Sequence, residues 1–214
     1  MITLGILSLL AAYLLGSLAS AVWIGKWLYN IDVREHGSGN AGATNVFRVL
    51  GKKAGIPVLL IDALKGWLAV MIPVWLLGNF DSPVLFENFR VLCGAMAVLG
   101  HVFPVFAGFR GGKGVATLLG VAFGMFPIAA LCGLGLFMLV LLSTHYVSLG
   151  SILASLGYGL FLLMVEKVYH DASVIFAITI PLLVIVTHKA NIQRLLSGSE
   201  NRTYLRGNRR HKRL

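Results

Sequence analysis

The residues of this chain that could do chemistry gather in three polar segments between long apolar runs. In the first segment, 36–48, three glycines within six residues allow backbone N–H groups to approach an anion closely. Thr44 or Asn45 could cap a short helix that ends near Gly51, with Arg48 about one turn further on. The segment predicts a phosphate-binding loop, although an ordinary turn between two helices would have the same composition.

The second segment, 100–117, carries Arg110 and Lys113 at the start of an apolar run. Two basic residues at a membrane surface need no further role, but Gly112 and Gly114 on either side of the lysine favour contact with a phosphate. The segment is not a Walker A loop, because the lysine is followed by glycine rather than by Ser or Thr. It therefore predicts a phosphate contact and gives no indication of nucleotide hydrolysis.

The third segment begins at His188, and Asn191 and Arg194 follow at intervals of three residues. If the preceding apolar helix continues, the three side chains lie within about 120° of one helix face. The alternative is a basic helix end that extends into the lipid surface, which suits the Arg-rich residues beyond Thr203 better. The three polar side chains are therefore candidates for positioning a ligand.

Composition places these segments in a membrane protein. The chain has 214 residues, of which 57% are apolar and 12% charged, and its mean hydropathy is +0.85, whereas soluble domains have about 25% charged residues. We expect an all-α integral membrane helical bundle that forms a single domain over 1–214. The first apolar run is expected to be a retained helix rather than a signal peptide, because no Lys or Arg precedes Lys26. The apolar stretches are 2–25, 54–77, 89–109, 115–143, 147–166 and 172–188.

The stretch 115–143 decides the topology. Its 29 residues contain Pro127 near the middle, so it is either one long tilted helix or a hairpin of two helices of about 14 residues, short for a full crossing. With a hairpin, 15 of the 18 Lys and Arg residues share one face, whereas a single helix would export the eight basic residues from Lys189 onward. The charge pattern favours seven transmembrane helices, an outside N-terminus, a cytoplasmic C-terminus and a basic cytoplasmic tail at 207–214.

Ionisable residues inside the apolar stretches are few. Asp62 and Lys65 are three residues apart and are expected to form an ion pair. A structural and a functional role for this pair are equally supported by the sequence. No clustered carboxylates suit Mg²⁺ and no Ser-His-Asp arrangement is present, so neither a metal site nor a hydrolase is predicted. Basic glycine loops would also serve a phosphate or organophosphate transporter. An enzyme is favoured because no repeat is visible and the polar residues gather at one surface.

Three ordered strings carry a resemblance to a known family. They are Gly37-Ser38-Gly39-Asn40 through Arg48, Gly100-His101 with Gly111-Gly112-Lys113-Gly114, and His188, Asn191, Arg194-Leu195-Leu196, Gly198 and Glu200. Together they resemble the cytoplasmic motifs of the bacterial acyl-phosphate:glycerol-3-phosphate acyltransferases, integral membrane enzymes of phospholipid synthesis. The resemblance covers nearly the whole chain, and its main departure is a longer Arg-rich tail after Glu200.

The resemblance implies a reaction and its partners. A fatty acyl group would move from acyl phosphate to the 1-hydroxyl of glycerol 3-phosphate, giving 1-acylglycerol 3-phosphate (lysophosphatidate) and phosphate. The enzyme would lie in the bacterial inner membrane with its active face cytoplasmic. Its partners would be the two substrates, membrane lipid and, through a functional link, the enzyme that makes acyl phosphate. No nucleic acid, cofactor or metal is implied.

The resemblance and the residue chemistry together give an expected site. The catalytic residues would be Lys113, His188, Asn191 and Ser38. The general base would be His188 or an oxygen of the donor phosphate, and the phosphate is favoured because no carboxylate–histidine dyad is evident. The expected substrate-binding residues are Gly39, Asn40, Gly42, Thr44, Asn45, Arg48, His101, Gly111, Gly112, Gly114, Ser151, Arg194 and Glu200.

Overall fold

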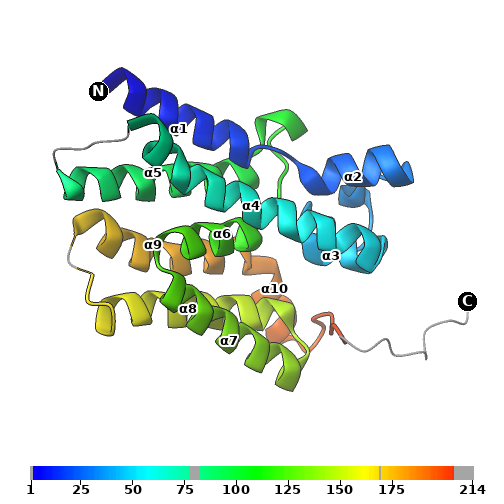
Figure 1. Cartoon of the computed structure of the whole chain (residues 1–214). Helices are drawn as coiled ribbons and strands as arrows, with labels where there is room; N and C mark the ends of the chain where they lie inside the picture. The colour runs from blue at the N-terminus through cyan, green and yellow to red at the C-terminus, as the bar shows by residue number, and fades with distance from the viewer. Residues whose placement is uncertain (1, 78–81, 169, 205–214) are drawn as a thin grey trace, which may run out of the picture.

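The computed structural model describes residues 2–77, 82–168 and 170–204 (Figure 1). Within these ranges every regular element is helical, which confirms the all-α prediction; the expected basic tail at 207–214 lies outside them. The elements are α1 (Ile2–Gly16), α2 (Ser20–Tyr29), η1 (Val33–Glu35), α3 (Ala43–Val49), α4 (Lys52–Leu77), α5 (Pro83–Val102), η2 (Val105–Ala107), α6 (Val115–Met125), α7 (Pro127–Thr144), α8 (Val147–Met164), α9 (Asp171–Thr187) and α10 (Lys189–Leu196).

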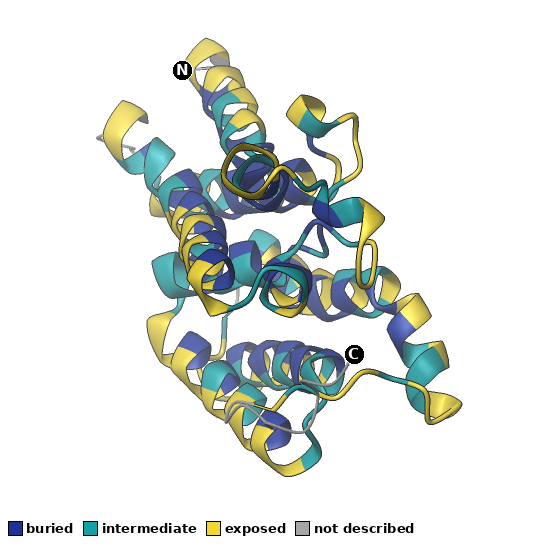
Figure 2. Ribbon diagram, turned by 90° about the vertical axis from the view of Figure 1, so that its right-hand side faces the viewer, coloured by how far each residue is buried: buried dark blue, intermediate teal, exposed yellow. Residues whose placement is uncertain are grey.

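The helix lengths suit a membrane bundle. Within the described residues, five segments are long and apolar enough to cross a bilayer, and the bent pair α9–α10 is a sixth if it counts as one span. Helix α6 has only 11 residues, or roughly 17 Å against a hydrocarbon core of about 30 Å. Figure 2 shows buried residues facing inward and exposed ones outward, and exposed side chains such as Leu60 and Leu139 would face lipid. Seven crossings remain a prediction.

The stretch 115–143 is two helices, as the hairpin interpretation expected, although their lengths are unequal. Helix α6 ends at Met125, and α7 begins at Pro127 and runs for 18 residues. Proline suits this first helical position because it has no N–H to leave unsatisfied. At the end of α6, the Gly124 carbonyl accepts a hydrogen bond of 2.5 Å from the Arg90 guanidinium of α5, which satisfies one of the carbonyls that a helix end exposes.

Glycines allow several helices to cross in close contact. A Cβ on Gly66 of α4 would lie 2.1 Å from the Thr117 carbonyl oxygen of α6. Conversely, a Cβ on Gly120 of α6 would lie 1.8 Å from the Ala63 carbonyl oxygen of α4. Small residues at such crossings let helix backbones approach in a membrane, where packing rather than water exclusion drives association. Helix α6 is thereby fixed against α4.

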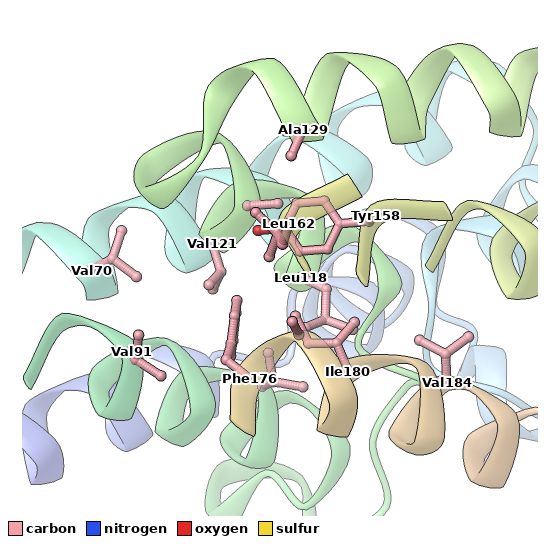
Figure 3. Close-up of a cluster of buried hydrophobic side chains, with 14 residues drawn as sticks. Val70, Val91, Leu118, Val121, Ala129, Tyr158, Leu162, Phe176, Ile180 and Val184 are labelled. Carbon is pink, nitrogen blue, oxygen red and sulfur yellow. The ribbon is translucent and has the colours of Figure 1, made fainter. Parts of the chain in front are cut away.

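The main apolar core lies around α6. Figure 3 shows side chains from α4, α5, α6, α7, α8 and α9 converging there, among them Leu118, Val121, Leu162 and Phe176. This core fixes the ends of α5, α6 and α9, which carry the second and third polar segments. In Figure 1, α2, α3 and α10 lie at the same end of the bundle, so the helices next to the three polar segments share one end.

Candidate active site

Lys113 and Asn191 meet although they are 78 residues apart in the sequence. Lys113 lies in the loop before α6, and its Nζ donates a hydrogen bond to Asn191 Oδ1 on α10. The Thr187 hydroxyl at the end of α9 donates to the Lys113 carbonyl at 3.4 Å. The second and third polar segments therefore contact each other at this end of the bundle.

Glu200 fixes the other side of this contact. Its Oε1 accepts hydrogen bonds from Asn191 Nδ2 at 2.6 Å and from Ser148 Oγ of α8 at 2.9 Å. Its Oε2 pairs with Arg194 Nε at 2.7 Å. Asn191 Oδ1 accepts from Lys113 and Asn191 Nδ2 donates to Glu200, so these two partners determine the orientation of the amide. Glu200 therefore holds Asn191 and, through it, the Lys113 amine.

The chain after α10 folds back to deliver Glu200. Ser199 N donates to the Arg194 carbonyl at 2.8 Å, and Thr203 N donates to the His145 carbonyl at 2.7 Å. The Tyr204 ring lies on the His145 ring with a centroid separation of 4.5 Å. This return segment ties α10 to the loop between α7 and α8. Tyr204, at the end of this segment, is the last residue that the structure describes.

The helix expected to continue through His188 instead bends there. Helices α9 and α10 meet at 64°, and His188 has φ −102° and ψ 10°, outside the helical values. The prediction of one continuous helix face for His188, Asn191 and Arg194 is therefore wrong. His188 is buried in the bend, and its Nδ1 donates to the Val184 carbonyl at 2.8 Å. Since a carbonyl only accepts, Nδ1 carries the proton and Nε2 has the lone pair.

The first glycine loop is held together by Asn45. Its Oδ1 accepts from Ser38 N at 2.8 Å and Ser38 Oγ at 3.1 Å, and its Nδ2 donates to the carbonyls of Val33 and His36 at 2.7 and 3.0 Å. The predicted cap by Thr44 or Asn45 is wrong, because the N-cap of α3 is Gly42, without a side-chain cap bond. All polar atoms of the Asn45 amide serve the loop, while Ser38, Gly39, Thr44 and Arg48 are exposed.

The first and second loops lie against each other. A Cβ on Gly112 would lie 3.1 Å from the Ala41 carbonyl oxygen, and Arg34 Nη1 donates to the Ala107 carbonyl at 2.8 Å. Arg34 also pairs with Asp32 at 2.8 Å, and this contact holds the pKa of that carboxyl well below its usual range. The two glycine loops and α10 therefore gather at one end of the bundle.

Burial and charge set the protonation of the network. Burial lowers the pKa of Lys113 to about 8; Glu200 opposes this shift, and the positive charges of Arg194 and Arg48 add to it. Burial acts to raise the pKa of Glu200, but hydrogen bonds from Asn191, Arg194 and Ser148 together bring it below its ordinary value. At neutral pH the site therefore holds an ammonium and a carboxylate joined by an amide.

Several expected residues lie apart from this network. His101 is buried on α5 beside Asp62, and the Ser151 hydroxyl bonds the Val147 carbonyl of its own helix at 2.9 Å. The serine that contacts Glu200 is Ser148, whereas Ser151 had been predicted from the sequence. Gly111 N and Gly112 N donate hydrogen bonds to carbonyls at the end of α5, and Gly114 caps α6 in a left-handed conformation with φ +83°.

In the described part of the chain, no three His, Cys, Asp or Glu side chains form a metal-binding group.

Comparison with known proteins identifies the family. The family model described as "Glycerol-3-phosphate acyltransferase" matches residues 6–198. Glycerol-3-phosphate acyltransferase 2 of Bacillus anthracis is 43% identical over 93% of this chain and 99% of its own length. The Chlorobaculum tepidum glycerol-3-phosphate acyltransferase is 42% identical over 91% of this chain and 94% of its own length.

Two crystal structures have the same fold. They are of PlsY (YgiH), an integral membrane glycerol 3-phosphate acyltransferase, in its glycerol 3-phosphate and lysophosphatidic acid forms. The first has a TM-score of 0.84 and 42% identity and covers 94% of this chain and 96% of that one. The second has a TM-score of 0.80 and 41% identity, with coverage of 94% and 95%. The chain belongs to the glycerol-3-phosphate acyltransferase family of integral membrane proteins.

Proposed function

We propose that this protein transfers a fatty acyl group from acyl phosphate to the 1-hydroxyl of glycerol 3-phosphate, releasing 1-acylglycerol 3-phosphate and inorganic phosphate. The observation that carries the proposal is the meeting of glycine-flanked Lys113 with Asn191, Arg194 and Glu200 at one end of an apolar bundle. The two PlsY structures, named for glycerol 3-phosphate and lysophosphatidic acid, support the acceptor and the product.

The charged groups suit two phosphorylated substrates. Lys113 and the exposed Arg48 contact the phosphate of glycerol 3-phosphate, and Ser38 with the backbone N–H groups of 40–42 contacts the donor phosphate. Asn191 and His188 position the glycerol hydroxyls, because the Asn191 amide can donate and accept and His188 Nε2 can accept. Glu200 and Arg194 hold Asn191 in place rather than touching the reacting atoms.

Acyl phosphate is an activated mixed anhydride, so the alcohol can attack it directly without a covalent acyl-enzyme. The hydroxyl oxygen attacks the acyl carbon, the bond from that carbon to the phosphate oxygen breaks, and the hydroxyl proton leaves on the phosphate. The lysine ammonium and the loop N–H groups stabilise the negative charge that develops.

The general base is an oxygen of the donor phosphate. Glu200 accepts three hydrogen bonds and its pKa is lowered, so it is a weak base. His188 Nδ1–H donates a hydrogen bond to the Val184 carbonyl, so no carboxylate stands at that nitrogen to raise the basicity of the ring. Its Nε2 orients a hydroxyl of the acceptor.

The reaction takes place at the cytoplasmic face of the bacterial inner membrane. Lys26 lies on α2 and Arg34 on η1, Lys52 and Lys53 begin α4, and Lys189 begins α10. In Figure 1, α2, α3 and α10 lie at one end of the bundle. Such a basic end faces the cytoplasm under the positive-inside rule. With α6 and α7 counted as two crossings, the chain spans the membrane seven times with its N-terminus outside. A separate enzyme must supply the acyl phosphate.

The proposal is tested with purified protein in detergent or lipid cubic phase. Glycerol 3-phosphate is supplied with palmitoyl phosphate, palmitoyl-CoA or palmitoyl-acyl carrier protein, and lysophosphatidate and phosphate are measured together. We expect equimolar products from palmitoyl phosphate only, with the acyl group on the 1-hydroxyl. Turnover with palmitoyl-CoA, or none with any donor, would refute the proposed donor; phosphate release without lysophosphatidate would refute acyl transfer.

A further inference from the structure

A second group of charged side chains lies inside the bundle, beneath the loop that carries Lys113. Asp62 and Lys65 of α4 are 1% and 2% exposed, and Lys65 Nζ is 2.8 Å from Asp62 Oδ1. His101 of α5 is 6% exposed, and its Nδ1 lies 3.6 Å from the same oxygen. Ionisable groups within a membrane bundle are expensive, so their presence calls for a function.

The Asp62 group is anchored on several helices. Ser20 Oγ of α2 donates to Asp62 Oδ1 at 2.8 Å. Lys65 Nζ donates to the Leu18 carbonyl at 2.9 Å, in the break between α1 and α2. Asp62 therefore ties the α1–α2 break and α4 to His101 on α5. The contacts with Ser20, Lys65 and His101 all meet at Asp62 Oδ1, and together they limit the carboxylate to one rotamer.

The His101 ring supports the second glycine loop directly. A Cβ on Gly112 would lie 2.1 Å from His101 Nε2, so the loop backbone packs against the ring. Gly112 N also donates to the His101 carbonyl at 3.1 Å, and Gly111 N donates to the Val102 carbonyl at 3.2 Å. Lys113 follows Gly112 in the chain, so the position of the His101 ring also determines the position of the Lys113 backbone.

The space around these groups excludes a substrate. The cavity lined by Asp62, Lys65, His101, Gly111 and Gly112 has a volume of about 10 Å³, which is roughly room for one water molecule. Glycerol 3-phosphate cannot enter it. His101, which the sequence placed among the expected substrate-binding residues, thus packs beneath the loop.

We propose that Asp62 and His101 are positioning residues: Asp62 holds the His101 ring, the ring holds Gly112, and Lys113 is thereby kept on Asn191. Only the expected loss of catalytic activity rests on the proposed function. The position of the Lys113 amine can be measured without turnover, so failure of one proposal is distinguishable from failure of the other.

The test compares His101→Ala, His101→Gln and Asp62→Asn with Leu162→Ala. Leu162 is fully buried in the core on α8. Its replacement by alanine should destabilise the bundle without changing the loop, so Leu162→Ala is the matched control. Reductive methylation followed by mass spectrometry gives the labelling rate of Lys113 against pH, with exposed Lys189 as the internal reference. Thermal unfolding in the same detergent shows which variants fold.

We expect a Lys113 labelling midpoint near 8 in the wild type, because burial lowers the pKa of this lysine to about 8. We expect it to rise toward that of a solvated lysine in His101→Ala and Asp62→Asn, less in His101→Gln, and to stay unchanged in Leu162→Ala. In the same variants kcat/KM for glycerol 3-phosphate falls about 10–100-fold, as for a misplaced catalytic group.

An unchanged midpoint in folded His101→Ala and Asp62→Asn would overturn the proposal, and so would an equal rise in Leu162→Ala. Failure of all three His101 and Asp62 variants to fold would also overturn it, because the pair would then serve folding alone. Raised midpoints in a protein that transfers no acyl group would uphold the positioning role and refute the proposed function.

Discussion

Replacing Glu200 tests whether one carboxylate organises the site. Glu200→Gln keeps the size of the side chain and an oxygen that can accept from Ser148 and Asn191. Its new NH₂ group would face Arg194 Nε, so two donors would oppose each other where an ion pair now stands. Glu200→Ala removes all three contacts and frees the Asn191 amide to rotate away from Lys113.

The magnitudes follow from these contacts. A hydrogen bond to a charged group contributes about 1.5–3 kcal/mol. The Arg194 side chain is 35% exposed and can turn to water, so the loss of its pair contributes nearer to 1 kcal/mol. Since about 1.4 kcal/mol is a factor of ten in rate, a loss near 1 kcal/mol in Glu200→Gln should lower kcat/KM for glycerol 3-phosphate about fivefold. The alanine variant loses two further bonds and should fall about 100-fold or more.

The assay measures kcat and KM for both substrates with palmitoyl phosphate as donor, together with thermal unfolding in matched detergent. Glu166→Gln, an exposed carboxylate outside the site, is the control and should behave as wild type. Equal losses in Glu200→Gln and Glu200→Ala would refute the graded network. A folded Glu200→Ala variant with activity within a factor of two of wild type would refute the role of Glu200 altogether.

Three further outcomes are expected. Asn45→Ala removes four hydrogen bonds that hold the first loop to α3 and should lower the free energy of unfolding by about 2–3 kcal/mol, measured by thermal unfolding. Gly66→Ala forces a Cβ to within 2.1 Å of a carbonyl oxygen and should prevent correct assembly, whereas Gly135→Ala meets nothing within 4 Å and should remain monodisperse in size-exclusion chromatography. Because the Lys113 ammonium loses its proton near pH 8, kcat/KM should fall as pH rises through 8, and Lys113→Arg should lack this step because a guanidinium stays charged.

The sequence predicted the elements whose physical causes are local. The break within 115–143 follows from Pro127 and the charge distribution, and the Asp62–Lys65 pair follows from the cost of single charges in a membrane. The unequal division of that stretch was not predicted, although it follows from the place of Pro127, at which α7 begins. The bend at His188 was not predicted, because the spacing of apolar residues does not indicate that the His188 ring donates a hydrogen bond to the Val184 carbonyl of α9.

The site was predictable as three segments but not as a network. Asn45 was selected for the right loop, yet its amide serves the loop rather than an anion. Ser148 and Ser151 are equivalent in the sequence, and only the return of the chain after α10 distinguishes them by bringing Glu200 to Ser148. Contacts between residues far apart in the chain depend on helix rotation, which composition and spacing leave open.

The central claim is that Lys113 and its partners carry out acyl transfer to glycerol 3-phosphate. The direct measurement is the yield of lysophosphatidate per phosphate released from palmitoyl phosphate, for wild type, Lys113→Met and the matched exposed-residue control Lys189→Met. We expect one-to-one products from wild type and Lys189→Met, and a loss of about 10²–10³ in kcat/KM for folded Lys113→Met. Wild-type kcat/KM in Lys113→Met would contradict the account.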